Sequence, residues 1–132
     1  MIAIDSNILL RFVVRDDDNQ YRKAAAFLTG RTGESSVFVS AVVLMETVWV
    51  LRRHYRYSKA QVESLVSELL QAVELSFEQE EYLSILLSTG SGLKGDIADY
   101  LVALSADRAG CAKTVTFDRR AAKAVPGMEL LA

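Results

Sequence analysis

The sequence predicts an α/β fold with a mainly parallel central sheet that is flanked by helices. Short apolar segments rich in Val and Ile alternate along the chain with longer segments whose apolar residues recur at helical spacing. Strands that alternate with helices favour parallel pairing, with helices on both faces of the sheet. The chain has 132 residues, of which 51% are hydrophobic and one is proline, and this composition fits a single domain over residues 1–132.

The first elements follow from the pattern of apolar residues. The apolar run Met1–Ile4 predicts a short buried strand that ends at Asp5. Ser6–Val14 carries apolar residues at the spacing of one helix face and predicts a helix. Gln20–Leu28 predicts a second helix, and the short apolar run Val37–Val39 predicts a second strand.

Serine residues mark the starts of the next two helices, because a serine hydroxyl can accept a hydrogen bond from the first turn of a helix. Ser40 predicts a helix to about His54, and Ser58 predicts one to about Ala72. The remaining expected elements, in chain order, are the strand Val73–Ser76, the helix Glu78–Leu87, the glycine-rich loop Thr89–Gly95, the helix Asp96–Arg108, the strand Lys113–Phe117, the helix Arg119–Ala124 and the strand Met128–Leu131.

The charge and the cysteine content limit the classes of function. The formal net charge is −2, which argues against a protein that holds nucleic acid by overall charge alone but allows a local basic rim. Cys111 is the single cysteine and cannot form an internal disulfide, which fits a reducing compartment. The N-terminus is interrupted early by Asp5 and does not resemble a signal peptide, and the longest apolar run, Val37–Leu51, is too short to span a bilayer. We therefore expect a soluble, cytoplasmic protein.

Acidic residues lie where the predicted strands end. Asp5 follows the first strand and Asp118 follows the fourth. Glu46 lies in the second turn of the helix after the second strand, and Asp99 lies three residues after Asp96 on the same face of a later helix. Because sites in parallel sheets form at the carboxyl ends of the strands, we expect these carboxylates to meet at one rim.

Clustered carboxylates repel one another, by roughly 4 kcal/mol for two unit charges about 4 Å apart at an effective dielectric near 20. Protonation, a basic partner or a metal ion must offset this cost. His54 is the only histidine and the chain has no cysteine pair, so the sequence predicts an all-oxygen ligand set, which suits Mg²⁺ or Mn²⁺ and disfavours zinc. A metal held in this way activates a bound water and stabilises charge on a phosphodiester, so hydrolysis of RNA or DNA is the expected reaction.

Structural interpretations remain open for these acids. Asp5, Asp96 and Asp118 each precede a predicted helix, so N-capping explains each of them taken alone. Asp99 has the position of a residue that interacts with the helix dipole. Glu46 is different, because it is the only charge in an apolar run; we expect it to be partly buried and to need a partner.

Basic and aromatic residues have both structural and functional interpretations. Arg11, Lys94 and Arg119 lie near the acids in the sequence and are candidates for a rim that contacts RNA. The run Asp16–Asp18 is interpreted as a solvated helix cap, and Trp49 as a core residue.

Three segments, taken in order, match a known family. MIAIDSNILLR (residues 1–11) combines a hydrophobic strand, an Asp, an Asn two residues later and an apolar helix. SAVVLMETVWVLRR (residues 40–53) is a helix with one acid, and GDIADYLVALSADRAGCAKTVTFDRRAAKAVPGMELL (residues 95–131) has an Asp-led helix, a Thr-Phe-Asp strand end and a closing Pro-Gly. This ordered set resembles the PIN-domain ribonucleases over almost the whole chain. The nearest branch is similar to the VapC-type toxins of toxin–antitoxin pairs, and it implies the PIN-like (Rossmann-like) three-layer fold.

The resemblance also implies roles for individual residues. It implies four catalytic acids, namely Asp5, Glu46, Asp99 and Asp118. The metal ion, Mg²⁺ or Mn²⁺, would be held by Asp5 and Asp99, with Asp96 and Asp118 as further candidate ligands. Asn7 and Thr116 would orient the carboxylates. Such toxins cleave RNA, often tRNA or rRNA, tend to form homodimers, and are held inactive by a small antitoxin protein.

Two other functions stay open. A phosphatase of the haloacid-dehalogenase class also begins with an Asp at a strand end, and Gly95-Asp96-x-x-Asp99 is similar to its metal loop. Those enzymes use Asp-x-Asp, however, and this chain has Asn7 at the second position. The other alternative is a non-catalytic PIN-like module that binds a partner. The presence of the full set of acids argues against this alternative.

Overall fold

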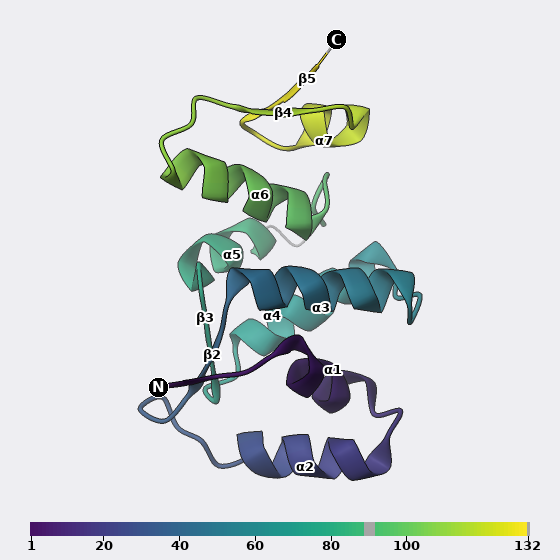
Figure 1. Ribbon diagram of the computed structural model, residues 1–132, viewed down its shortest axis with the longest axis vertical. Coiled ribbons are helices and arrows are strands. Elements are labelled where there is room, and N and C mark those ends of the chain that lie inside the picture. The colour runs from purple at the N-terminus through teal and green to yellow at the C-terminus, as the bar shows by residue number, and fades with distance from the viewer. Residues whose placement is uncertain (89–91, 132) are drawn as a thin grey trace. The chain divides into compact units, whose positions relative to one another are not determined.

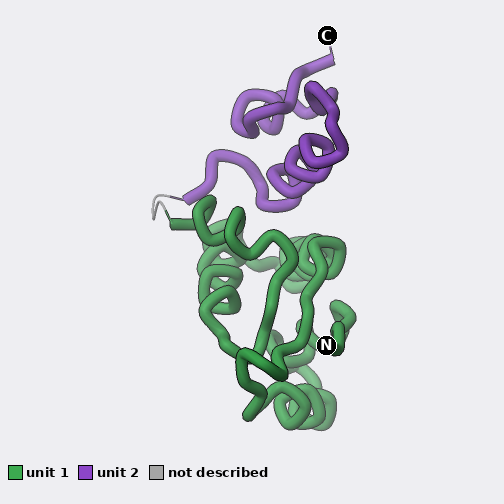
Figure 2. The backbone as a smooth tube through the Cα atoms, turned by 90° about the vertical axis from the view of Figure 1, so that its left-hand side faces the viewer, with its two compact units in different colours: residues 1–89 green, residues 90–132 purple. Residues whose placement is uncertain are grey.

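The computed structural model describes residues 1–88 and 92–131 of the chain. The chain divides into two compact units, residues 1–89 and residues 90–132, which Figure 2 shows in different colours, and each unit is described by itself. The expectation of one domain over residues 1–132 stays a prediction.

A three-stranded parallel sheet lies in the first unit (Figure 1). Its strands, in spatial order, are β1 (Ile2–Ala3), β2 (Val37–Val39) and β3 (Leu75–Phe77). Ile2 pairs with Val37, and Val37 pairs with Leu75 on its other side. The central strand β2 is the most buried, since Val37 and Val39 are both inaccessible to solvent. The prediction that the first strand is buried was wrong except at Ile4, because β1 lies at the end of the described strand order and its two residues are exposed.

Five helices accompany this sheet in the described part of the first unit. They are α1 (Ser6–Val14), α2 (Asp18–Leu28), α3 (Ala41–Arg53), α4 (Lys59–Leu70) and α5 (Glu80–Leu87). Helix α1 packs against α2 and α3, and α4 packs against α3, α5 and β3. The fully buried side chains on these helices are Leu9, Leu44, Thr47, Leu51, Val62, Val66 and Leu83.

Polar side chains cap the starts of α2, α3 and α4. The Ser40 hydroxyl accepts a hydrogen bond from the Val43 N–H at 3.1 Å, as predicted. Ser58 forms a reciprocal capping box with Gln61. Asp17 caps α2, so this helix begins at Asp18, two residues before the predicted start.

Glu78 connects the end of β3 to the start of α3. Its Oε1 atom accepts a hydrogen bond from the Ala41 N–H at 2.7 Å, which satisfies a backbone donor that has no partner within the helix. The predicted helix Glu78–Leu87 therefore starts later, at Glu80, after Gln79 has turned the chain through a φ of 63°. This contact fixes α3, which carries Glu46, to the carboxyl end of the sheet.

The second unit contains one long helix and a small β-α-β element. Its elements are α6 (Ile97–Arg108), β4 (Thr114–Thr116), α7 (Arg119–Ala124) and β5 (Met128–Leu130). The strands β4 and β5 pair in parallel, with Thr116 opposite Leu130, and α7 contacts both of them.

Gly95 brings the start of α6 close to the end of α7. A Cβ atom at this position would lie 2.9 Å from Cγ2 of Val125 and 3.4 Å from Cε2 of Tyr100. Tyr100 also donates a hydrogen bond from its hydroxyl to the Ala124 carbonyl, at 3.4 Å. A side chain at position 95 would therefore disturb the packing that holds α6 against α7.

These observations confirm the mixed α/β class with parallel strand pairing. Residues 89–91 of the predicted loop Thr89–Gly95 lie outside the described residues. No helix in residues 1–88 and 92–131 has both the length and the apolar character that a transmembrane helix needs.

Candidate active site

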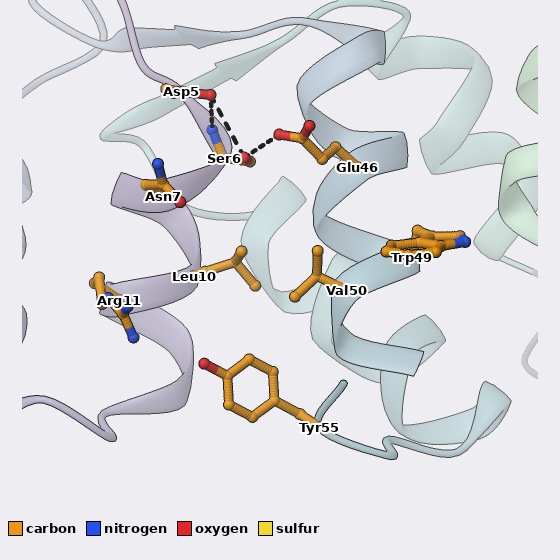
Figure 3. A pocket seen from close by; sticks show the side chains of 9 residues that line it. All are labelled: Asp5, Ser6, Asn7, Leu10, Arg11, Glu46, Trp49, Val50 and Tyr55. Carbon is orange, nitrogen blue, oxygen red and sulfur yellow. Dashed lines mark hydrogen bonds between the residues drawn. The ribbon is translucent and has the colours of Figure 1, made fainter. Parts of the chain in front are cut away.

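Two of the predicted acids converge on one serine (Figure 3). Asp5 is the N-cap of α1, and its Oδ1 atom accepts a hydrogen bond from the Ser6 N–H at 2.7 Å. The Ser6 hydroxyl lies 3.4 Å from the same oxygen and donates to Oε1 of Glu46. Ser6 is only 4% exposed, so the junction of β1 with α1 holds this hydroxyl in place. The strand end and the second turn of α3 thus deliver Asp5 and Glu46 to the same polar group.

The outward face of α3 carries Glu46 and Trp49, three residues apart. Both side chains are exposed, Trp49 by 60%, whereas Leu44 and Thr47 of the same helix face the core. The prediction that Trp49 belongs to the core was wrong, and Glu46 is exposed instead of partly buried, although it has the expected partner in Ser6. The physical reason is that α3 is apolar on both faces, so its composition does not reveal which side packs inward.

A pocket of about 520 Å³ extends from these carboxylates between α1 and α3. It is lined by Asp5, Ser6, Asn7, Leu10, Arg11, Glu46, Trp49, Val50 and Tyr55. In Figure 3, Asp5, Ser6 and Glu46 lie at one end, Arg11 and Tyr55 lie at the other, and Leu10 and Val50 lie between them. The pocket therefore has an acidic end, an apolar middle and an end with a cation and a phenol.

Asp16 organises the second end of the pocket. Its Oδ1 atom is 2.8 Å from Nη1 of Arg11, and its Oδ2 atom accepts a hydrogen bond from the Tyr55 hydroxyl at 2.8 Å. The hydrogen bond from Tyr55, followed by the ion pair with Arg11, lowers the pKa of Asp16 below its ordinary value. Asp16 is exposed, as expected for a solvated run, but Asp17 is the residue that caps α2.

The second unit holds the other predicted acids. Burial first, and then the negative charges of Asp96 and Asp118, raise the pKa of Asp99 above its ordinary value. The charges of Asp96 and Asp118 therefore act on Asp99 within the unit. Asp118 accepts a hydrogen bond from the Ala121 N–H at 3.0 Å, while its own N–H donates to the Thr116 hydroxyl oxygen at 3.0 Å.

The N-capping interpretation holds for two of the three acids to which it was applied. Asp5 and Asp118 both accept a hydrogen bond from the backbone at the start of a helix. Asp96 occupies the N-cap position of α6, but within the described residues its side chain makes no capping hydrogen bond. Of the other candidates, Asn7 is exposed in the pocket lining, and Lys94 and Arg119 are exposed in the second unit.

The donor set of the first unit fits a hard divalent cation. Neither Asp5 nor Glu46 forms an ion pair with a residue that the structure describes, so no basic side chain balances this pair. Mg²⁺ usually keeps several waters and binds through one or two carboxylates together with phosphate oxygens of a substrate, which two converging carboxylates can support. Across residues 1–88 and 92–131, no group of three or more Asp, Glu, His or Cys side chains is arranged to hold a metal ion by itself.

Parallel strands, flanking helices and a pocket with paired carboxylates define an α/β protein with an acidic site. The PIN domain family model matches residues 2–126, and the chain belongs to the PIN domain family. Proteins of this family are typically metal-dependent nucleases, generally with Mg²⁺. No curated protein is detectably similar to the chain.

Sequence reasoning did not identify Ser6 and Tyr55 as parts of this pocket, or Asp16 as the residue that binds both Arg11 and Tyr55. Ser6 could have been found, because a hydroxyl directly after a strand-end Asp lies at the first turn of the helix. Asp16 and Tyr55 are 39 residues apart and meet only through tertiary packing, so no local signal connects them.

Proposed function

We propose that the protein is a metal-dependent endoribonuclease that hydrolyses RNA phosphodiester bonds. The observation that carries this proposal is the convergence of Asp5 and Glu46 on Ser6, where neither carboxylate forms an ion pair with a described residue. The proposal is also supported by the family to which the chain belongs, because PIN domain proteins are typically metal-dependent nucleases.

In this proposal the acids have distinct roles. Asp5 and Asp99 would hold Mg²⁺ or Mn²⁺, with Asp96 and Asp118 as further candidate ligands. The bound ion would supply an activated water and stabilise negative charge on the phosphodiester. Glu46 would orient the attacking water, and the Ser6 hydroxyl, which donates to Glu46, would keep this carboxylate in position. The raised pKa of Asp99 supports its role, because like charges gathered at one place are typical of a cation site.

The supporting residues follow from the same arrangement. Asn7 lines the pocket beside Asp5, and Thr116 holds the backbone of Asp118, so both would orient acids. Lys94 and Arg119 are exposed and would contact the RNA backbone, together with Arg11 of the pocket.

We further propose that the protein is the toxin of a toxin–antitoxin pair and acts in the cytoplasm as a homodimer, with tRNA or rRNA as a candidate substrate. This part rests on the likeness of three ordered segments to VapC-type toxins. Expression of the parent chain should arrest growth, and coexpression of an antitoxin encoded by a neighbouring reading frame should relieve the arrest. Growth that is unaffected by the active enzyme would contradict the toxin role.

The activity is tested by incubating RNA with the purified chain and Mg²⁺ or Mn²⁺. We expect cleavage that EDTA abolishes and that Asp5→Asn reduces by about 10²–10³-fold, the scale of losing a group that stabilises the transition state. Asp107→Asn, which removes an exposed carboxylate from α6, is the matched control and should cleave like the parent. If Asp5→Asn cleaves as well as the parent, the assignment is wrong.

A non-catalytic module is separated from a nuclease by metal binding. A ligand that binds only the folded state raises the melting temperature, so the parent should be stabilised by Mn²⁺ and Asp5→Asn should be stabilised less. The same melting temperature with and without Mn²⁺ would favour the non-catalytic alternative. A phosphoryl group trapped on Asp5 would instead indicate phosphatase chemistry, which membership of the PIN domain family does not support.

A further inference from the structure

The end of the pocket opposite the carboxylates carries a guanidinium that is bound by Asp16, and Asp16 is bound in turn by Tyr55. Arg11 comes from α1, Asp16 from the turn after α1, and Tyr55 from the turn after α3. Asp16 uses one carboxylate oxygen for Arg11 and the other for the Tyr55 hydroxyl, both at 2.8 Å. These three residues, Arg11, Asp16 and Tyr55, are called the arginine anchor below.

The arginine anchor leaves hydrogen-bond donors available to a ligand. A guanidinium has five N–H groups in a planar fork, and the hydrogen bond to Asp16 is made through Nη1. Arg11 lines the pocket and its side chain is 35% exposed, so the remainder of the fork is accessible to a ligand. Phosphate oxygens match this fork geometry, which is why Arg is common wherever phosphate is bound.

The spacing along α1 suits a nucleic-acid strand. Asp5 and Arg11 are six residues apart, and at about 1.5 Å per residue this corresponds to roughly 9 Å along the helix. Successive phosphates of a stacked strand advance by about 3.4 Å, so this length corresponds to a few nucleotides at most. Leu10 and Val50 line the stretch between the two ends and provide an apolar surface along it.

Stability alone does not account for the arginine anchor. The ion pair is exposed, and exposed ion pairs contribute little to folding. Both turns that deliver its members pass through a non-glycine residue in the left-handed region, Arg15 at φ 58° and Arg56 at φ 59°. Such backbone conformations are unfavourable for residues with a Cβ atom, and they cluster where a structure holds functional groups.

We propose that Arg11 binds a non-scissile phosphate of a single-stranded RNA whose scissile phosphate lies at Asp5 and Glu46. Asp16 and Tyr55 are positioning residues that hold the guanidinium toward the pocket. The inference rests on the proposed ribonuclease function and adds to it a second point of contact with the RNA. An unpaired strand is expected because a pocket between two helices does not admit a duplex, whereas an extended strand can follow α1.

The experiment measures RNA binding by the full chain in EDTA, so that no cleavage occurs. A short fluorescent single-stranded RNA of mixed sequence is titrated at several salt concentrations by anisotropy. One phosphate contact to a single strand contributes about 0.7 to the slope of log K against log salt. We expect Arg11→Gln to reduce the slope by about this amount and to raise the Kd about tenfold. Arg22→Gln removes the same charge from an exposed position of α2 and should change neither value.

A second variant tests the positioning role. Tyr55→Phe removes the hydroxyl that binds Asp16 but changes no charge. We expect it to raise the Kd by about two- to tenfold, the effect of one hydrogen bond, while the salt slope stays that of the parent. An unchanged Kd for Tyr55→Phe would contradict the positioning role. Melting temperatures in EDTA confirm that each variant is folded.

Three results would overturn the subsite. The first is that the parent and Arg11→Gln have equal salt slopes. The second is that the parent binds no single-stranded RNA. The third is that the parent binds uridine monophosphate or an RNA duplex as tightly as it binds the single strand. These outcomes are separate from the cleavage assay. A chain that cleaves RNA with Mg²⁺ but shows no Arg11-dependent slope retains the proposed function and loses the subsite. A chain that shows an Arg11-dependent slope but does not cleave RNA retains the subsite and loses the proposed function.

Discussion

The hydrogen bond between Ser6 and Glu46 should be measurable as a coupling free energy. Ser6 is 4% exposed and its hydroxyl donates to a carboxylate, and a hydrogen bond to a charged group contributes about 1.5–3 kcal/mol. Glu46 is exposed and water replaces part of that interaction, and alanine is a better helix former than serine by up to about 0.5 kcal/mol. We therefore expect Ser6→Ala to lower the free energy of unfolding by about 1–2 kcal/mol.

A double-mutant cycle isolates this interaction from other effects of the substitutions. The parent, Ser6→Ala, Glu46→Ala and the double variant are unfolded with urea in EDTA. Trp49 is the only tryptophan and lies on α3, so its fluorescence reports on the first unit. We expect a coupling free energy of about 1 kcal/mol or more, within the range found for residues in contact. Additive effects of the two substitutions, within about 0.3 kcal/mol, would refute the argument that Ser6 holds Glu46 in place.

Three further substitutions test the scaffold of the two units. Glu78→Ala removes the acceptor for the Ala41 N–H at the start of α3 and should cost about 1–2 kcal/mol in urea unfolding, because it leaves a helix donor unsatisfied. Gly95→Ala places a methyl group 2.9 Å from a Val125 carbon and should cost about 1–3 kcal/mol, measured as a lower melting temperature of the second unit. Asp99→Asn should stabilise the metal-free chain while abolishing cleavage. Because the pKa of Asp99 is raised, the folded chain keeps a proton that the unfolded chain has released, so stability falls as pH rises through the interval between the two pKa values. We expect Asp99→Asn to remove this fall and to raise the free energy of unfolding at neutral pH, where the parent carries the buried charge.

Each of these substitutions has a control on the same chain. Glu81→Ala removes an exposed carboxylate from α5 and should leave the unfolding curve unchanged. Gly33→Ala adds a methyl group where no atom lies within 4 Å. Asp107→Asn removes an exposed charge from α6 and should not alter the pH dependence of stability. If a control changes stability as much as its test variant does, the local contact is not the cause of the change.

Much of the secondary structure could be predicted because its boundaries are encoded locally. The predicted bounds of the helices Ser6–Val14 and Arg119–Ala124 and of the strand Val37–Val39 are those of the structure. Ser40 and Ser58 cap helices as expected, since a capping hydrogen bond involves residues only three apart. Local chemistry of this kind does not depend on how the rest of the chain packs.

The orientation of α3 and the arginine anchor could not be predicted in the same way. Residues 41–51 are apolar on nearly every side, so the sequence does not reveal that Trp49 faces outward and Leu44 inward. The contact between Asp16 and Tyr55 depends on the packing of α1 against α3, which brings together turns that are far apart in the chain. The proposed grouping of Asp5 and Glu46 with Asp99 joins residues of both units and stays a prediction.

The capping role of Asp5 has a practical consequence for work on the complex with RNA. Asparagine is as good as aspartate at the N-terminus of a helix, so Asp5→Asn should keep the hydrogen bond to the Ser6 N–H and the start of α1 intact. The same change removes one negative charge from the acidic end of the pocket, where the proposed function places the phosphodiester. Asp5→Asn should therefore serve as a substrate trap that expresses without damaging its host and that retains uncleaved RNA for crystallisation.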